Sequence, residues 1–134
     1  MTKVNSNPQM LAEVFAVLKP DQRIQPVPLT PEIYTNLNAD FAGFKNHVLI
    51  SSHEFSEDWS SWERHPAGDE LVMLLSGSAT LVLRTDDGDR PIDITEPGSY
   101  VIVPRNTWHT ARVSQATRML FVTPGEGTEN VEEP

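Results

Sequence analysis

Four side chains suited to metal binding or acid–base chemistry occur in two segments that are far apart in the chain. Glu63 and His65 are two residues apart in a segment of strand-like composition, so both side chains should project from one face. Glu70 follows after a four-residue turn, and His109 lies 39 residues later. The chain has no cysteine, so any metal must be held by His and carboxylate side chains. Two imidazoles with one or two carboxylates suit Fe(II), Mn(II), Ni(II) or Zn(II).

The spacing around the first of these segments resembles the first sequence motif of the cupin superfamily. That motif is a His-x-His pair, followed by four residues, Glu, six residues and Gly. His65, Glu70 and Gly77 match its second His, its Glu and its closing Gly. Glu63 stands where the family has the first His, and Glu57 stands where it has an earlier Gly. A carboxylate still binds divalent cations, so the exchange at position 63 changes the site without abolishing it.

The segment before His109 resembles the second cupin motif, which is Gly, five residues, Pro-x-Gly, two residues and His. Gly98, Pro104 and His109 match it. Asn106 replaces the middle Gly, and Asn also tolerates left-handed backbone angles. Val113 replaces the closing Asn of the motif.

The resemblance covers residues 44–123 and implies a small single-domain cupin, an all-β double-stranded β-helix or jelly-roll barrel. It implies His65, Glu70 and His109 as metal ligands, and Glu63 as a fourth ligand on condition that its carboxylate takes the place of the missing imidazole. The two-His-plus-carboxylate sites of the family favour Fe(II) or Mn(II) over Ni(II) or Zn(II). The rings of residues 65 and 109 should then lie within about 8 Å of each other.

Two functions are open for such a site. One is a metal-dependent dioxygenase or isomerase whose small organic substrate chelates the metal through a carboxylate, enol or diol, with a non-ligating Glu63 as general base. The other is a non-catalytic module that binds or senses a sugar or another metabolite in the same pocket, with metal absent or structural. A buried hydrogen-bonded cluster without metal is the structural alternative to both.

Aromatic residues near the motif segments are the candidate lining of a substrate pocket. His53 and Phe55 share one face of the preceding strand and are expected to border the pocket opposite the metal. Trp59 precedes the next strand, where its indole could line the pocket mouth or stack on a sugar or aromatic ligand. By alternation, Trp62 and Trp108 should face away from the site.

From residue 44 onward, β-branched and aromatic runs alternate with turn residues about every eight to twelve residues, which is typical of a sandwich or barrel. Seven or eight short strands are predicted, at residues 45–55, 60–65, 70–75, 79–85, 91–94, 99–103, 109–113 and 118–123. The strand at residues 70–75 is apolar on both faces. We therefore expect its outer face to be covered by N-terminal helices or by a second copy of the chain in a homodimer. An interior strand of a two-sheet sandwich is the alternative.

The two ends of the chain differ from the middle. Apolar residues recur at helical spacing over residues 8–19, and Thr30-Pro31-Glu32 predicts a second short helix that runs to about residue 38. We assign residues 1–43 to an N-terminal arm with these two helices, 44–123 to the barrel, and 124–134 to a disordered acidic tail.

Ten basic and nineteen acidic side chains give a formal net charge of −9. This charge repels phosphate backbones and anionic membranes, so we expect no nucleic-acid or membrane partner, and a small-molecule substrate or ligand instead. No stretch approaches the roughly 20 apolar residues needed to span a bilayer. The N-terminus lacks the pattern of a signal peptide, which predicts a cytoplasmic protein.

Overall fold

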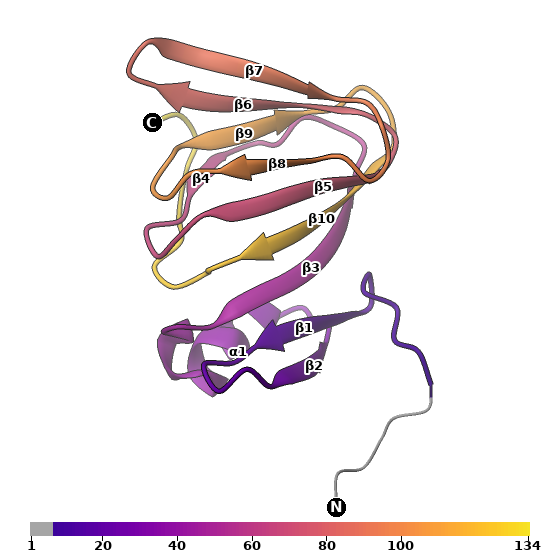
Figure 1. Ribbon diagram of the computed structural model, residues 1–134, viewed down its shortest axis with the longest axis vertical. Helices are drawn as coiled ribbons and strands as arrows, with labels where there is room; N and C mark the ends of the chain where they lie inside the picture. The colour runs from indigo at the N-terminus through magenta and orange to yellow at the C-terminus, as the bar shows by residue number, and fades with distance from the viewer. Residues whose placement is uncertain (1–6) are drawn as a thin grey trace, which may run out of the picture.

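The computed structural model describes residues 7–134, and its strands form two antiparallel sheets (Figure 1). One sheet has the strand order β2-β1-β3-β10-β5-β8 and the other β11-β4-β9-β6-β7. The strands are β1 (Val14–Leu18), β2 (Ile24–Pro28), β3 (Val48–Phe55), β4 (Trp62–Arg64), β5 (Glu70–Ser76), β6 (Ala79–Thr85), β7 (Gly88–Ile94), β8 (Tyr100–Val103), β9 (His109–Arg112), β10 (Thr117–Thr123) and β11 (Glu129–Val131). The helices are α1 (Ile33–Asp40) and the 3₁₀ turn η1 (Ala42–Phe44).

The predicted all-β jelly-roll class is confirmed. Each of the eight strands predicted between residues 44 and 123 has a counterpart, β3 to β10, with ends that differ by up to three residues. Along β10 every second residue is buried, as expected for a strand with one face toward the core. The core lies between the two sheets, where Val72, Leu74, Leu81 and Met119 are fully buried. Burying such a side chain contributes about 1.5–3 kcal/mol, so this layer holds the sheets together.

The prediction of a helix over residues 8–19 is wrong, because Val14–Leu18 form β1. This strand pairs with β2 on one side and with β3 on the other, so it extends the sheet. Phe15 and Val17 are fully buried, which is the period of a strand and not of a helix. In a segment this short, the apolar residues fit both the helical and the strand period. Pairing with the edge of β3 favours the strand.

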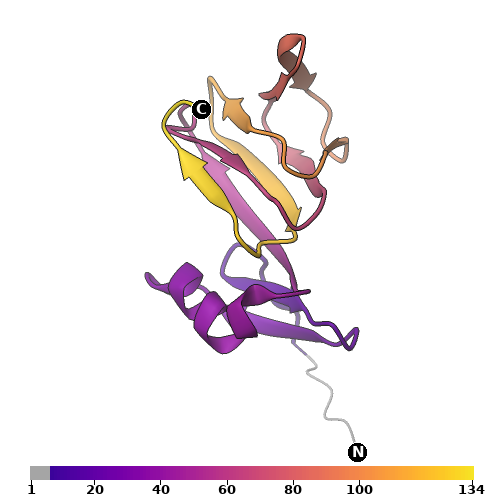
Figure 2. The same ribbon diagram turned by 90° about the vertical axis from the view of Figure 1, so that its left-hand side faces the viewer.

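The second predicted helix is present as α1, followed by η1. Ile33 and Leu37 on α1 and Phe44 on η1 pack with Phe15 and Leu49 in a second apolar cluster. Figures 1 and 2 show α1 beside β1 and β2 at one end of the molecule, with β6 and β7 at the other. Within residues 7–134 no helix is long and apolar enough to cross a membrane.

The predicted disordered tail takes a defined position along the second sheet. β11 pairs antiparallel with β4, and Glu129 contacts Arg64 at 3.0 Å. Further along, Glu133 contacts Arg84 of β6 at 2.8 Å. The acidic residues that suggested disorder therefore have arginine partners that lie 49 to 65 residues away in sequence, and composition alone does not reveal them.

Asn106 and Gly77 are motif positions with left-handed backbone angles, as the sequence predicts for Asn106. Asn106, which replaces the motif Gly, has a φ of 61°. Gly77, between β5 and β6, has a φ of 82°, and a Cβ there would lie 2.6 Å from the Ala116 carbonyl oxygen. Position 77 therefore requires glycine both for its dihedral angle and for the close backbone approach.

We expect Gly77→Ala to lower the free energy of unfolding by about 3 kcal/mol or more, since strain and overpacking add at this position. Gly43→Ala is the matched control. Gly43 also has a positive φ, 68°, but open space around it, so its loss should be about 1–2 kcal/mol. Urea unfolding followed by circular dichroism measures both values, and equal losses would contradict the proposed backbone clash.

Candidate metal centre

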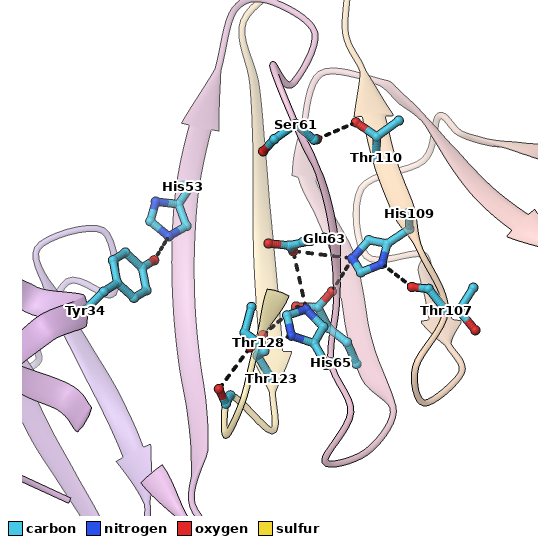
Figure 3. Close-up of polar contacts among 12 residues, drawn as sticks. Tyr34, His53, Ser61, Glu63, His65, Thr107, His109, Thr110, Thr123 and Thr128 are labelled. Atoms are coloured by element: carbon cyan, nitrogen blue, oxygen red, sulfur yellow. Dashed lines mark hydrogen bonds and ion pairs between the residues drawn. The ribbon is translucent and has the colours of Figure 1, made fainter. Parts of the chain in front are cut away.

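The four side chains singled out by the sequence converge inside the barrel (Figure 3). Glu63 and His109 are paired across β4 and β9, and His65 follows β4 directly. Glu70 begins β5 and reaches the same point from the opposite sheet. The four residues each offer a ligand atom, and these atoms all lie within 4.8 Å of one another. The centroids of the two imidazole rings are 5.5 Å apart, inside the predicted limit.

Both imidazoles direct their Nε2 atoms at the same two carboxylates. His65 Nε2 lies 3.4 Å from Glu63 Oε1 and 3.2 Å from Glu70 Oε2. His109 Nε2 lies 3.3 Å from Glu63 Oε1 and 3.1 Å from Glu70 Oε1. The side chains of His65, Glu70 and His109 are almost completely buried, whereas that of Glu63 is 23% exposed. Glu63 is therefore the member of the group that solvent or a substrate can contact most easily.

The other ring nitrogens are held by acceptors outside the group. The Thr128 hydroxyl donates to the Gly125 carbonyl at 2.9 Å, so its oxygen accepts from His65 Nδ1–H at 2.8 Å. His109 Nδ1–H donates to the Thr107 carbonyl at 2.9 Å. In their neutral forms both rings therefore carry the proton on Nδ1 and present the Nε2 lone pair to the carboxylates. Partners of this kind typically orient metal-binding histidines.

The Glu70 carboxylate is also fixed by a residue that the sequence did not single out. The Thr123 hydroxyl donates to Glu70 Oε2 at 2.6 Å. Thr123 ends β10 on the interior face of the strand, in line with the buried Phe121. A hydroxyl at such an interior position needs a polar partner, and this alternation is the signal that could have identified it. Thr128 had no such signal, because it lies in the segment that composition marked as disordered.

In the absence of a cation the four groups balance one another's charge. Burial lowers the pKa values of the two histidines, but the adjacent Glu63 and Glu70 carboxylates outweigh it and raise them to about 9 for His65 and about 10 for His109. Burial raises the pKa values of Glu63 and Glu70, but hydrogen bonds from both histidines lower them, for Glu63 to about 2. Two imidazolium ions and two carboxylates thus face one another at neutral pH. The same Nε2 atoms would have to lose their protons to bind a metal.

A cavity of about 650 Å³ adjoins the centre, with Glu63 and Glu70 on its wall. The predicted pocket residues His53, Phe55 and Trp59 all lie on this wall, together with Phe121. The structure thus brings them to the same cavity as the two carboxylates.

Trp62 and Trp108 have other surroundings, in agreement with the alternation of the strands. The Arg84 guanidinium lies over the Trp62 ring, 4.4 Å from its centroid. The Arg64 guanidinium lies over the Trp108 ring at 4.6 Å. Both indoles therefore serve packing and cation–π contacts.

A tyrosine from the N-terminal arm completes the cavity wall. Tyr34 of α1 places its hydroxyl 2.9 Å from His53 Nε2 of β3 (Figure 3). Tyr34 is 55% exposed as a residue, but its hydroxyl is turned toward His53. Reduced solvation, together with the nearby Glu63 and Glu70 charges, raises the pKa of Tyr34 to about 12. Burial lowers the pKa of His53. Sequence reasoning missed Tyr34 because nothing local places α1 against the barrel opening.

Comparison with protein-family models finds no match for this chain. Among curated proteins it is similar to a ureidoglycolate lyase of Chelativorans sp. (strain BNC1), with 37% identity over 78 residues. That alignment covers 53% of this chain and 47% of the lyase. The chain therefore spans about half the length of the curated relative that it matches.

Solved structures resemble the chain in fold. A mutant of Bacillus subtilis oxalate decarboxylase is similar with a TM-score of 0.50 and 17% identity, over 63% of this chain and 23% of that one. A cupin superfamily protein from Desulfitobacterium hafniense DCB-2 is 28% identical, with a TM-score of 0.48, over 57% of this chain and 65% of that one. The two antiparallel sheets have the arrangement of the cupin fold, and the Glu/His/Glu/His group lies between them. The fold predicted from the two sequence motifs is confirmed.

The raised histidine pKa values predict a specific pH dependence of stability for the metal-free protein. Folding raises these values from 6.5 to about 9 and about 10. The stabilisation is therefore complete below pH 6.5 and is lost progressively as the pH rises to about 10. On the acid side, the stabilisation from Glu63 is lost as the pH falls from 4.5 toward about 2. We expect the Tm of chelator-treated protein to decrease steadily from pH 6.5 to pH 10.

Metal should reverse this trend, because coordination requires neutral imidazoles. The increase in Tm caused by saturating Mn²⁺ should grow from pH 6 to pH 8.5. Differential scanning calorimetry with and without chelator measures both series, with His65→Gln as a variant that loses much of the alkaline slope. A metal-free Tm that stays constant from pH 6.5 to pH 10 would contradict the charge arrangement described here.

Proposed function

We propose that this protein binds one divalent metal ion through His65, His109, Glu70 and Glu63, and a small organic molecule in the adjoining cavity. The observation that supports this most strongly is the direction of the two Nε2 atoms. Both point at the same pair of carboxylates, while both Nδ1 atoms are occupied by other acceptors. Nitrogen and oxygen donors in this number suit Fe(II) or Mn(II) first, and Ni(II) or Zn(II) next.

The reaction class that we propose is that of a metal-dependent dioxygenase or isomerase. When bound, such an ion would supply activation of dioxygen or stabilisation of a substrate enolate. Two carboxylate ligands would offset its charge, which disfavours water activation. Glu63 is the group that faces the cavity, so in a state where it does not ligate it can take a proton from the substrate. The similarity to a lyase fits a catalytic protein.

One observation favours a second function, a non-catalytic module that binds or senses a small molecule. The metal-free group is already charge-balanced, because two imidazolium ions face two carboxylates. A buried group of this kind satisfies its own charges, so the cavity could bind a metabolite or sugar without an ion. Metal content separates the two functions.

We expect about one metal ion per chain in protein purified without chelators, measured by elemental analysis. His65→Ala should retain less than a tenth of it, since one ligand and its orienting hydrogen bond are lost. His47→Ala is the matched control, because His47 hydrogen-bonds the Lys45 carbonyl outside the site and should leave the metal content unchanged. Wild-type protein that is metal-free and does not take up Mn²⁺, Fe²⁺ or Zn²⁺ in titration would contradict the first function.

We also propose that the protein is a homodimer, formed through the outer face of the larger sheet. Side chains from three neighbouring strands lie there in apolar rows, with Leu71 beside Val122 and Ile102, and Met73 beside Leu120 and Tyr100. Tyr100 and Ile102 are 57% and 45% exposed. A contiguous apolar face of this kind is typical of an isologous interface. The cytoplasmic location and the absence of nucleic-acid and membrane partners stay predictions from the sequence.

The wild-type protein should sediment at twice its 15.0 kDa chain mass. Ile102→Glu should shift it to the monomer, because the charge would be desolvated within the contact. Leu29→Glu, at an exposed site between β2 and α1, should leave the dimer intact. Sedimentation velocity at about 20 μM decides this, and a monomeric wild type would exclude the proposed interface.

A further inference from the structure

The cavity beside the proposed metal centre is lined by acidic side chains and by no Lys or Arg among the described residues. Five carboxylates line it: Glu54, Glu57, Asp58, Glu63 and Glu70. Glu54 pairs weakly with Arg118 at 3.9 Å, and Asp58 accepts a hydrogen bond from the Val113 backbone N–H. Glu57 is exposed at the rim. An anionic ligand would therefore enter a negative field and meet no cationic side chain that could pair with it.

The proposed ion would not reverse this field. Glu63 and Glu70 carry two negative charges, which equal the charge of a divalent cation. The centre is then neutral overall, and Glu57, Asp58 and the weakly paired Glu54 keep the cavity lining negative. A carboxylate substrate would bind with little electrostatic gain, while an uncharged ligand loses nothing in such a field.

One wall of the cavity is built from aromatic rings. The ring centroids of Phe55 and Trp59 are 5.4 Å apart, those of Trp59 and Phe121 6.0 Å, and those of Phe55 and Phe121 6.2 Å. His53 extends this wall at 5.9 Å from Phe121. Rings at these distances and in tilted or edge-to-face arrangements present faces and edges to a flat ligand ring.

Neutral hydrogen-bonding groups lie on the same cavity wall. The Tyr34 hydroxyl and His53 Nε2 form a pair at 2.9 Å, Ser51 adds a hydroxyl, and the Thr123 hydroxyl, which donates to Glu70, adds an acceptor. In Figure 3 the Tyr34 hydroxyl is directed at the His53 ring, and Glu63 lies farther along, beside His65 and His109. A ligand hydroxyl can both donate to and accept from such groups, whereas a carboxylate can only accept.

We propose that the cavity takes an uncharged, hydroxylated aromatic compound of the phenol or catechol class, with its ring against Phe55, Trp59 and Phe121, in preference to a carboxylate. This rests on the proposed function, which supplies the metal at one end of the ligand. The ligand enters uncharged, and a hydroxyl that ligates the metal would pass its proton to Glu63 in its non-ligating state, so that binding adds no net charge to the site. The preference for an uncharged aromatic ligand arises from the aromatic wall and from the carboxylates that line the cavity. It can therefore be tested separately from metal binding. The sequence analysis allows a carboxylate, an enol or a diol as the chelating group. The cavity favours the diol, with its two hydroxyls on neighbouring carbons of an aromatic ring.

The test is isothermal titration calorimetry of Mn²⁺-loaded protein at pH 7 without oxygen, using catechol, oxalate and cyclohexane-1,2-diol as probes and dopamine as a cationic catechol for comparison. Catechol should bind at least about tenfold more tightly than either of the others, through the aromatic contacts and the absence of charge repulsion. Phe55→Leu should weaken catechol binding about threefold to tenfold and leave the Mn²⁺ content unchanged. Phe41→Leu, which removes an aromatic ring of the second apolar cluster and does not line this cavity, is the matched control and should have no effect.

Three results would overturn the proposal: oxalate binding as tightly as catechol, unchanged catechol affinity in Phe55→Leu, or dopamine binding more than tenfold tighter than catechol, which would show a preference for cations. The Mn²⁺ content of each sample distinguishes this failure from failure of the metal proposal. If no metal binds, the proposed function fails, and the ratio of catechol to cyclohexanediol affinity in metal-free protein still tests the aromatic wall.

Discussion

The structure depends on one electrostatic constraint, which is that two carboxylates and two imidazole Nε2 atoms share a buried volume. Their ligand atoms lie within 4.8 Å of one another, and three of the four side chains are almost fully buried. Such a group is stable only if positive charge sits between the carboxylates, either as two protons on the imidazoles or as a metal ion. Protons and metal compete for the same nitrogen atoms, so the site links protonation, metal binding and stability.

The fold satisfies this constraint by bringing the two sheets together at one point. Glu63 and His109 come from adjacent strands of one sheet, and Glu70 comes from the other. Segments outside the barrel then complete the arrangement, because the C-terminal segment supplies Thr128 to His65 and the N-terminal helix supplies Tyr34 to the cavity. These flanking segments therefore belong to the candidate site as well as to the core. Substitutions in them should affect the chemistry without touching a ligand directly.

The parts of this arrangement that depend on local pattern were predictable from the sequence. Strands β3 to β10 follow from alternation and turn residues, and the motif spacing identified the four converging side chains. The errors arose where partners distant in sequence decide the structure. β1 took strand form because the edge of β3 was available to it, and residues 129–131 paired with β4 despite their polar composition. Tyr34, Thr123 and Thr128 acquire their roles only through such contacts. Metal preference and cavity chemistry depend on side-chain geometry that spacing does not encode.

Anomalous X-ray diffraction from crystals grown with Mn²⁺ and without chelator would locate a bound ion. We expect one strong anomalous peak at about 2.0–2.3 Å from His65 Nε2, His109 Nε2 and an oxygen of Glu70. Thr128 and Thr107 should keep their hydrogen bonds to the two Nδ1 atoms. A map with no peak at this position, and with both Nε2 atoms still hydrogen-bonded to the carboxylates, would show that the group is held together by protons and that the metal centre does not exist.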